Sequence, residues 1–169
     1  MCGIVGFTGT EDAISVLMEG LAKLEYRGYD SAGIALHQDN QIMVVKSKGR
    51  LAVLKEKLAT EKEVKSMAGI GHTRWATHGE PNDVNSHPQV SSSSRFAVVH
   101  NGIIENYAEL KEKLISKGYT FLSQTDTEVI ANLLDYYYKE DIIDAVIRVQ
   151  NKLEGSYALG VSTLRLADF

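Results

Sequence analysis

Apolar positions in the first third of the chain change from short continuous runs to helical spacing and back. The run 2–7 ends near Gly9 and predicts a strand. The next apolar residues recur three and four positions apart and predict a helix: Ile14, Leu17, Met18, Leu21 and Leu24. Two β-prone runs, 33–36 and 42–46, flank the polar stretch HQDNQ and predict a hairpin.

The middle of the chain alternates in the same way. Residues 51–59 have helical spacing, and the runs 68–73 and 96–100 are strand-like. A polar, serine-rich segment at 77–94 separates these two strands, and we expect it to be a long loop.

Helical patterns dominate the last third. Asn106 with Glu109, and Thr125 with Glu128, have the spacing of capping boxes, so each pair predicts a helix start. A third helical run, 142–153, is expected to stop at Gly155, and 157–161 reads as a final strand: these are the last two predicted elements. The order of elements predicts an α+β fold over residues 1–169.

Composition narrows the class of protein. The 169 residues are 44% hydrophobic and 24% charged, which suits one globular domain. A formal net charge of −4 and a pI near 5.7 give no basic field for nucleic acid, so we expect no nucleic-acid partner. No apolar run reaches the roughly 20 residues that span a bilayer, and no export signal precedes the first strand; no membrane association is expected. The single cysteine cannot form an internal disulfide, which favours a reducing, cytoplasmic location.

That single cysteine is the first candidate for chemistry. Cys2 follows the opening Met1 directly, in the sequence MCGIVGF, where little chain precedes it to bury it. If Met1 were removed, Cys2 would carry a thiol and a free α-amino group on one residue. This arrangement combines a nucleophile with a possible general base.

Two polar segments join predicted elements in the first half of the chain. The segment EYRGYDSAG reads either as a helix stop at Gly28 or as part of a site. In GIGHTRWATHG, Arg74 could clamp a carboxylate with two parallel hydrogen bonds, or it could be a surface arginine stacked on Trp75. His72 and His78 lack the spacing of a metal-binding pair, and no metal or other cofactor is expected.

Two further segments allow more than one interpretation. Asn101 and Gly102, in VVHNGIIEN, form either a hairpin turn or a pair of donors for an oxyanion, and the residues alone do not decide. Asp126, in SQTDTEVI, falls in the first turn of a helix that Thr125 is expected to cap. The acid could stabilise the helix dipole or hold a substrate ammonium group, and spacing alone favours the dipole.

Taken together and in this order, these motifs and NSHPQ resemble the glutaminase half of the glucosamine-6-phosphate synthases over nearly the whole chain. The MCGI start and the Asn-Gly pair are similar to all amidotransferases with an N-terminal cysteine. The runs YRGYDS and RWATH resemble the sugar-phosphate enzymes in particular. The resemblance implies an N-terminal nucleophile hydrolase fold, with two antiparallel sheets between helical layers in a four-layer αββα arrangement.

The resemblance also implies a role for each candidate residue. Cys2 would be the nucleophile, with its own α-amino group as the base, and Asn101 with Gly102 would stabilise the oxyanion. Arg74 would bind the α-carboxylate of L-glutamine and Asp126 its α-ammonium group. The remaining implied site residues are Thr77 and His78 in the glutamine pocket, Trp75 in the loop that closes over it, and Gly28 beside the nucleophile.

The end of the chain departs from the pattern of the family. After GSYALGV, the residues STLRLADF do not resemble the family's continuation, so we expect a second sheet that is incomplete at the C-terminus. We also expect that the sugar isomerase (synthase) half is missing from this chain, and that unpaired sheet edges favour a homo-oligomer. Two other interpretations stay open: a non-catalytic remnant that binds glutamine or a partner subunit, and the glutaminase half of another class II amidotransferase.

Overall fold

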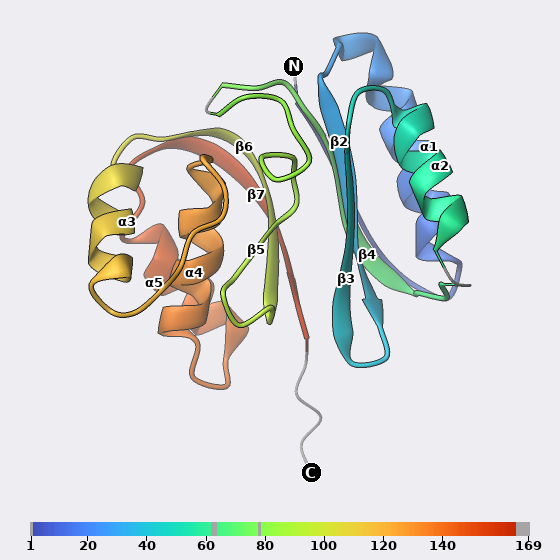
Figure 1. Ribbon diagram of the computed structural model, residues 1–169. Coiled ribbons are helices and arrows are strands. Elements are labelled where there is room, and N and C mark those ends of the chain that lie inside the picture. Colours follow the sequence, from blue (N-terminus) through green and yellow to red (C-terminus); the bar gives the residue numbers. More distant parts are fainter. Residues whose placement is uncertain (1, 62–63, 78, 165–169) are drawn as a thin grey trace.

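Two antiparallel sheets face each other, and helices cover the outer face of each (Figure 1). The structure is a computed structural model that describes residues 2–61, 64–77 and 79–164. Its strands are β1 (Gly3–Thr8), β2 (Ser31–Gln38), β3 (Gln41–Lys48), β4 (Ala68–Arg74), β5 (Gln89–Val90), β6 (Phe96–Ile104) and β7 (Gly155–Thr163). Its helices are α1 (Ala13–Leu24), α2 (Leu51–Thr60), α3 (Tyr107–Ile115), α4 (Thr127–Tyr137) and α5 (Ile142–Gln150), with a 3₁₀ turn at Glu25–Arg27. The predicted α+β class and the helix–sheet–sheet–helix layers are confirmed.

The first sheet has the strand order β1-β4-β2-β3, and α1 packs on its outer face. The carboxylate of Asp12 accepts hydrogen bonds from the N–H groups of Ile14 and Ser15, which caps the start of α1. Leu17 and Leu21 lie one turn apart on the face of α1 that is fully buried against the sheet. Together with α2, this helix forms the outer layer on one side of the molecule (Figure 1).

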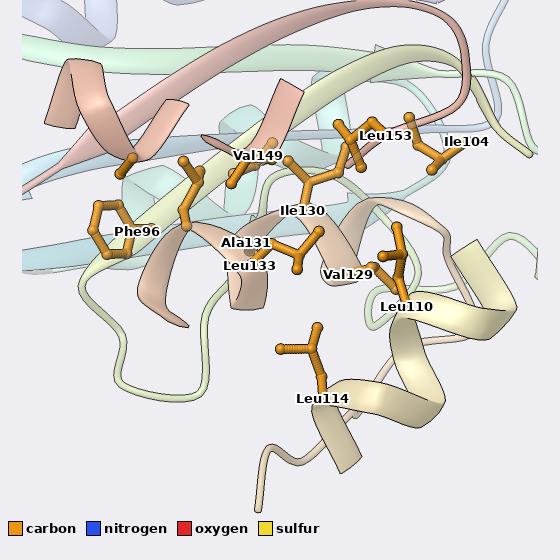
Figure 2. Packing of buried hydrophobic residues seen from close by; sticks show 13 residues of the cluster. Phe96, Ile104, Leu110, Leu114, Val129, Ile130, Ala131, Leu133, Val149 and Leu153 are labelled. Atoms are coloured by element: carbon orange, nitrogen blue, oxygen red, sulfur yellow. The ribbon is translucent and has the colours of Figure 1, made fainter. Parts of the chain in front are cut away.

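The second sheet, β5-β6-β7, owes its two-sided packing to the alternation of side chains along β6. Phe96 and Val98 are buried in the cluster that α3, α4 and α5 cover, part of which Figure 2 shows. Ala97 and Val99 belong instead to the cluster between the two sheets. Burial of a large side chain such as Phe96 stabilises the fold by roughly 1.5–3 kcal/mol.

Strand register brings the polar ends of three strands together. Gly3 pairs with Thr73 in the antiparallel β1–β4 ladder, which places Cys2 beside Arg74 at the end of β4. Strand β6 passes the same region, because the Asn101 amide contacts the backbone of Cys2. Cys2 and Arg74 of the first sheet and Asn101 of the second sheet therefore lie close together.

One local prediction is wrong, and two of the alternatives that the sequence left open are excluded. The Asn101–Gly102 pair forms no hairpin, because β6 continues through it to Ile104 and pairs with β7 throughout. The expected loop at 77–94 contains a short strand, β5, which pairs with β6. Arg74 is not a surface residue, since only 3% of it is exposed.

Neither of the two predicted capping boxes forms, although helices do begin near both. Asn106 precedes α3, but its side chain bonds the backbone at 152 and 154 instead of capping the helix. The N-cap of helix α4 is Asp126, one residue later than the expected Thr125. The Glu128 carboxylate accepts hydrogen bonds from the N–H groups of Leu122 and Ser123, so it fastens the preceding loop rather than completing a box with Thr125. No helix in the described ranges is long and apolar enough to cross a membrane.

Candidate active site

The thiol of Cys2 lies at the beginning of β1, against the backbone that follows β4. The Trp75 N–H donates to Cys2 Sγ over 3.1 Å, and the Trp75 carbonyl oxygen lies 3.6 Å from the same sulfur. Cys2 is half-buried and faces a cavity. A half-buried thiol that receives a backbone hydrogen bond and remains open to a cavity is suited to nucleophilic attack.

Arg74 supplies a buried cation to the same cavity. Its Nη2 donates to the carbonyl oxygen of Gly79 over 3.2 Å. Burial lowers the pKa of Arg74, and the nearby carboxylates of Asp30 and Asp126 oppose that effect. Asp30 also accepts a 2.5 Å hydrogen bond from the Ala76 N–H, which holds the backbone just after Arg74. The guanidinium is thus fixed in a place where it can bind an anionic group.

Asn101 lies between Cys2 and a buried histidine. Its Nδ2 donates to the backbone oxygen of Cys2 over 3.4 Å, and its Oδ1 lies 2.8 Å from His72 Nε2. The same His72 nitrogen lies 3.1 Å from the carbonyl oxygen of His100. Burial lowers the pKa of His72 to about 4, so the ring is neutral near pH 7.

Gly102 follows Asn101 in a conformation that few other residues adopt. Its φ of 130° lies in the left-handed half of the backbone map, and a Cβ built on it would come within 2.2 Å of the Ser156 oxygen. Both constraints require glycine here. Gly102 lines the cavity beside Asn101.

Asp126 brings a buried carboxylate to the same cavity. The Ile104 N–H donates to its Oδ2 over 2.9 Å, and its Oδ1 lies 3.9 Å from His100 Nδ1. The acid therefore ties the start of α4 to the end of β6. The competing interpretation, an acid that only stabilises the helix dipole, does not account for this strand contact or for its 4% exposure.

A buried polar network supports this region from beneath. The hydroxyl of Thr127 lies 2.6 Å from His87 Nε2 and 3.0 Å from His100 Nδ1, so it can donate to one ring and accept from the other. The rings of His72 and His87 contact edge to face, with centroids 4.5 Å apart. Burial holds the pKa of His87 well below its usual range, so this network is uncharged at neutral pH where it touches His72.

The cavity has a volume of about 460 Å³, enough for a small polar metabolite. Among the described residues its lining comprises Cys2, Arg27, Arg74, Trp75, Thr77, His87, His100, Asn101, Gly102, Ile103, Thr125 and Asp126. It therefore combines a thiol, a buried cation, a buried carboxylate and an amide donor.

Seven of the nine residues named from the sequence line this cavity: Cys2, Arg74, Trp75, Thr77, Asn101, Gly102 and Asp126. His78 lies outside the described residues. Gly28 is not among the described lining residues, but it lies against the Trp75 ring. A Cβ built on Gly28 would come within 3.3 Å of that ring, and the φ of Gly28 is 72°. The helix-stop interpretation of Gly28 is confirmed, because it ends the 3₁₀ turn and its N–H donates to the Glu25 oxygen.

Sequence reasoning assigned no role in the site to five lining residues: Arg27, His87, His100, Ile103 and Thr125. Each of the five lies within one of the polar motifs, so membership of a motif was the signal that could have pointed to the site. It also missed His72 as a partner of Asn101, since a lone histidine on a strand gives no sign of the amide it will meet.

Comparison with known proteins places these observations in a family. A family model described as a glutamine amidotransferase domain matches residues 72–166, more than half of the chain. The glutamine–fructose-6-phosphate aminotransferase (isomerizing) of Clostridium perfringens is 60% identical over 161 residues, which cover 95% of this chain and 26% of that protein. The enzyme of the same name from Aquifex aeolicus is 51% identical over 164 residues, covering 97% of this chain and 28% of that protein. The chain thus spans about a quarter of the length of these relatives.

Solved structures agree on the fold. The glutamine phosphoribosylpyrophosphate amidotransferase of B. subtilis, complexed with ADP and GMP, matches with a TM-score of 0.80 at 28% identity, over 96% of this chain and 35% of that one. A glutamine aminotransferase class-II domain protein of Silicibacter pomeroyi matches with a TM-score of 0.54 at 16% identity, over 79% of this chain and 65% of that one, which bears on the fold alone.

Proposed function

This chain belongs to the glutamine amidotransferase domain family, and from that premise we propose that it hydrolyses L-glutamine to glutamate and ammonia through a thioester on Cys2. Its fold is that of the N-terminal nucleophile amidotransferases. The observation that carries the proposal is the cavity, in which the Cys2 thiol lies with a buried cation and a buried carboxylate.

The two buried charges fit a free amino acid. The Arg74 guanidinium can hold the α-carboxylate of glutamine with paired hydrogen bonds, and the Asp126 carboxylate can hold the α-ammonium group. Because both α-substituents would be bound, an amide within a protein chain would leave two buried charges without partners. This makes free glutamine the favoured substrate.

The carboxamide of the bound glutamine would then meet Cys2. After Met1 is removed, the α-amino group of Cys2 takes the thiol proton, and the sulfur attacks the amide carbon. The Asn101 amide and the Gly102 N–H stabilise the oxyanion, and loss of one such donor typically lowers kcat by about 10²–10³-fold. The C–N bond breaks, the protonated amine gives its proton to the leaving ammonia, and a γ-glutamyl thioester remains.

Water completes the cycle. It attacks the thioester carbonyl, the C–S bond breaks, and glutamate leaves while the thiol is restored. Trp75, 55% exposed on the loop after β4, would close over the pocket during these steps, and Thr77 would contact the substrate from the lining. His78 is proposed for the pocket from the sequence alone.

We further propose that residues 1–169 act as the amide-donating half of glucosamine-6-phosphate synthesis from fructose 6-phosphate. The support is the 60% identity to an isomerizing aminotransferase over 95% of this chain. In this proposal the ammonia passes to a sugar isomerase unit, which corresponds to the part of the relatives that the chain does not span. A cytoplasmic location and a homo-oligomer remain predictions.

The test is glutamate release from L-glutamine by the purified chain, with removal of Met1 verified by mass spectrometry. Cys2→Ser replaces the thiol by a hydroxyl of similar size and serves as the matched control, alongside Cys2→Ala. We expect release by the unaltered chain and at least about a 10³-fold loss in both variants. Equal release by the variants would refute the role of Cys2, and D-glutamine hydrolysed as fast as L-glutamine would refute recognition by Arg74 and Asp126.

A further inference from the structure

His72 does not belong to the described lining of the cavity, yet it contacts a residue that does. It lies on β4 with none of its surface exposed, and its Nε2 is 2.8 Å from Asn101 Oδ1. The proposed mechanism uses Asn101 only through its amide nitrogen. What holds that amide in a productive orientation is therefore a separate question.

The groups around His72 determine which ring nitrogen carries the proton. Nε2 faces two oxygens, the Asn101 Oδ1 at 2.8 Å and the His100 carbonyl oxygen at 3.1 Å. A backbone carbonyl oxygen can only accept a hydrogen bond, so Nε2 must bear the hydrogen. Nδ1 is then unprotonated, and within the described part of the chain it has no hydrogen-bond partner.

The orientation of the Asn101 amide follows from an independent contact. The end of the Asn101 amide that faces away from His72 lies 3.4 Å from the backbone oxygen of Cys2, which is also an obligatory acceptor. The NH₂ group must therefore face Cys2, and the oxygen must face His72. If the amide rotated by 180°, two oxygens would oppose each other at Cys2, and two donors would oppose each other at His72.

The surroundings of His72 keep this arrangement in place. The edge of the His87 ring contacts the His72 ring, and Thr127 in turn fixes His87 and His100. A neutral ring is required here, because a protonated His72 would carry a second N–H into a site that offers Nδ1 no acceptor among the described residues. The low pKa of His72, which burial causes, is consistent with that requirement.

We propose that His72 is a positioning residue: its Nε2–H holds the Asn101 oxygen and so turns the Asn101 NH₂ toward Cys2. This inference rests on the proposed function for its kinetic consequence, because Asn101 matters to the rate only if it stabilises the oxyanion. Its geometric part, the protonated nitrogen and the amide orientation, stands without any activity.

A matched pair of variants separates positioning from packing. In His72→Gln the amide nitrogen is as many bonds from Cα as Nε2 and can donate to Asn101. His72→Met has similar length and no donor. We expect His72→Met to lower kcat for glutamine hydrolysis by about 10²-fold with KM changed less than about threefold, and His72→Gln to retain kcat within about tenfold. Equal kcat in the two folded variants would overturn the proposal.

A double-mutant cycle tests whether His72 acts through Asn101. Once Asn101 is replaced by alanine, no amide remains to be oriented, so adding His72→Met should lower kcat by less than about twofold further. If His72→Met still lowered kcat about 10²-fold in the Asn101→Ala background, His72 would act by another route and the proposal would be overturned. Circular dichroism and thermal unfolding report the folded fraction of each variant.

Nitrogen-15 NMR of the labelled, unaltered chain reads the geometric part directly. We expect His72 to appear as the neutral tautomer with the proton on Nε2, and the Asn101 side-chain NH₂ to shift in His72→Met but much less in His72→Gln. A proton on Nδ1 would overturn the proposal even if glutamine were hydrolysed. Conversely, an inactive chain with the expected tautomer would refute the proposed function and leave the positioning geometry supported.

Discussion

Acid should unfold this protein partly through His72. The folded chain holds this ring neutral with a pKa of about 4, whereas the ordinary value is 6.5. Above the unfolded value both states are neutral and the stability is fully present. As the pH falls from about 6.5 toward about 4, the unfolded chain binds a proton that the folded chain excludes, so the free energy of unfolding decreases.

The magnitude follows from the two pKa values. The full difference between 6.5 and about 4 corresponds to roughly 3 kcal/mol, of which about 2 kcal/mol is lost between about pH 7 and about pH 5. Burial is the largest cause of the low pKa of His72, and the nearby His100 and the Arg74 guanidinium disfavour its protonation further. The pKa of His87 is lowered in the same direction, which steepens the total loss.

The assay is urea unfolding followed by circular dichroism at about pH 7 and about pH 5, for the unaltered chain and for His72→Gln. The variant lacks the titrating ring, so the free energy of unfolding should decrease between the two pH values by about 2 kcal/mol less than in the unaltered chain. His37, which is partly exposed on β2, provides a matched control: His37→Gln should reduce the decrease much less. An equal decrease in His72→Gln and the unaltered chain would refute the reasoning, as would a stability that rises on acidification.

Other substitutions test the parts of the site and its support. Arg74→Lys replaces a two-pronged donor by a point charge, so KM for glutamine should rise at least about tenfold in steady-state assays; an unchanged KM would contradict carboxylate binding by Arg74. Asn101→Ala should lower kcat by about 10²–10³-fold with little change in KM, and a rise in KM alone would contradict the oxyanion role. Gly102→Ala forces a Cβ to within 2.2 Å of the Ser156 oxygen and should destabilise the chain by more than about 1 kcal/mol in urea unfolding, whereas unchanged stability would contradict the described backbone. Glu128→Gln removes an ionised acceptor of two backbone N–H groups and should lower the free energy of unfolding by about 1–3 kcal/mol; no change would mean that those bonds contribute nothing net.

Local sequence patterns predicted most elements, because helical and strand spacing records which face is buried. The alternation in β6 and the buried face of α1 are both readable in this way. The Asn101–Gly102 pair shows the limit. The local preference of this pair is a turn. Pairing with β7 along all nine residues of β6 outweighs that preference, and the local sequence carries no sign of this pairing.

The site could be predicted only in part. Cys2, Arg74, Asn101 and Asp126 come from four separate segments, and no local pattern states that these segments meet. Their roles came from resemblance to a family, while their proximity comes from the β1–β4 register and the passage of β6 beside Cys2.

Support for the site was the least predictable part. His72 looks like an ordinary core histidine until the amide it contacts is known. Asn106 and Glu128 each belong to a pair with capping-box spacing, but their side chains bond other backbone groups. Hydrogen bonds between segments distant in the chain decide each case. Sequence spacing carries no information about such bonds.

The γ-glutamyl thioester on Cys2 can be sought directly. The chain, freed of Met1, is mixed with L-glutamine, quenched in acid within the first turnovers, digested, and analysed by mass spectrometry for a glutamyl adduct. We predict the adduct on the Cys2 peptide, absent in Cys2→Ala and removed by hydroxylamine, which cleaves thioesters. Glutamate release with no adduct on Cys2, or with undiminished rate in Cys2→Ala, would contradict covalent catalysis by this cysteine.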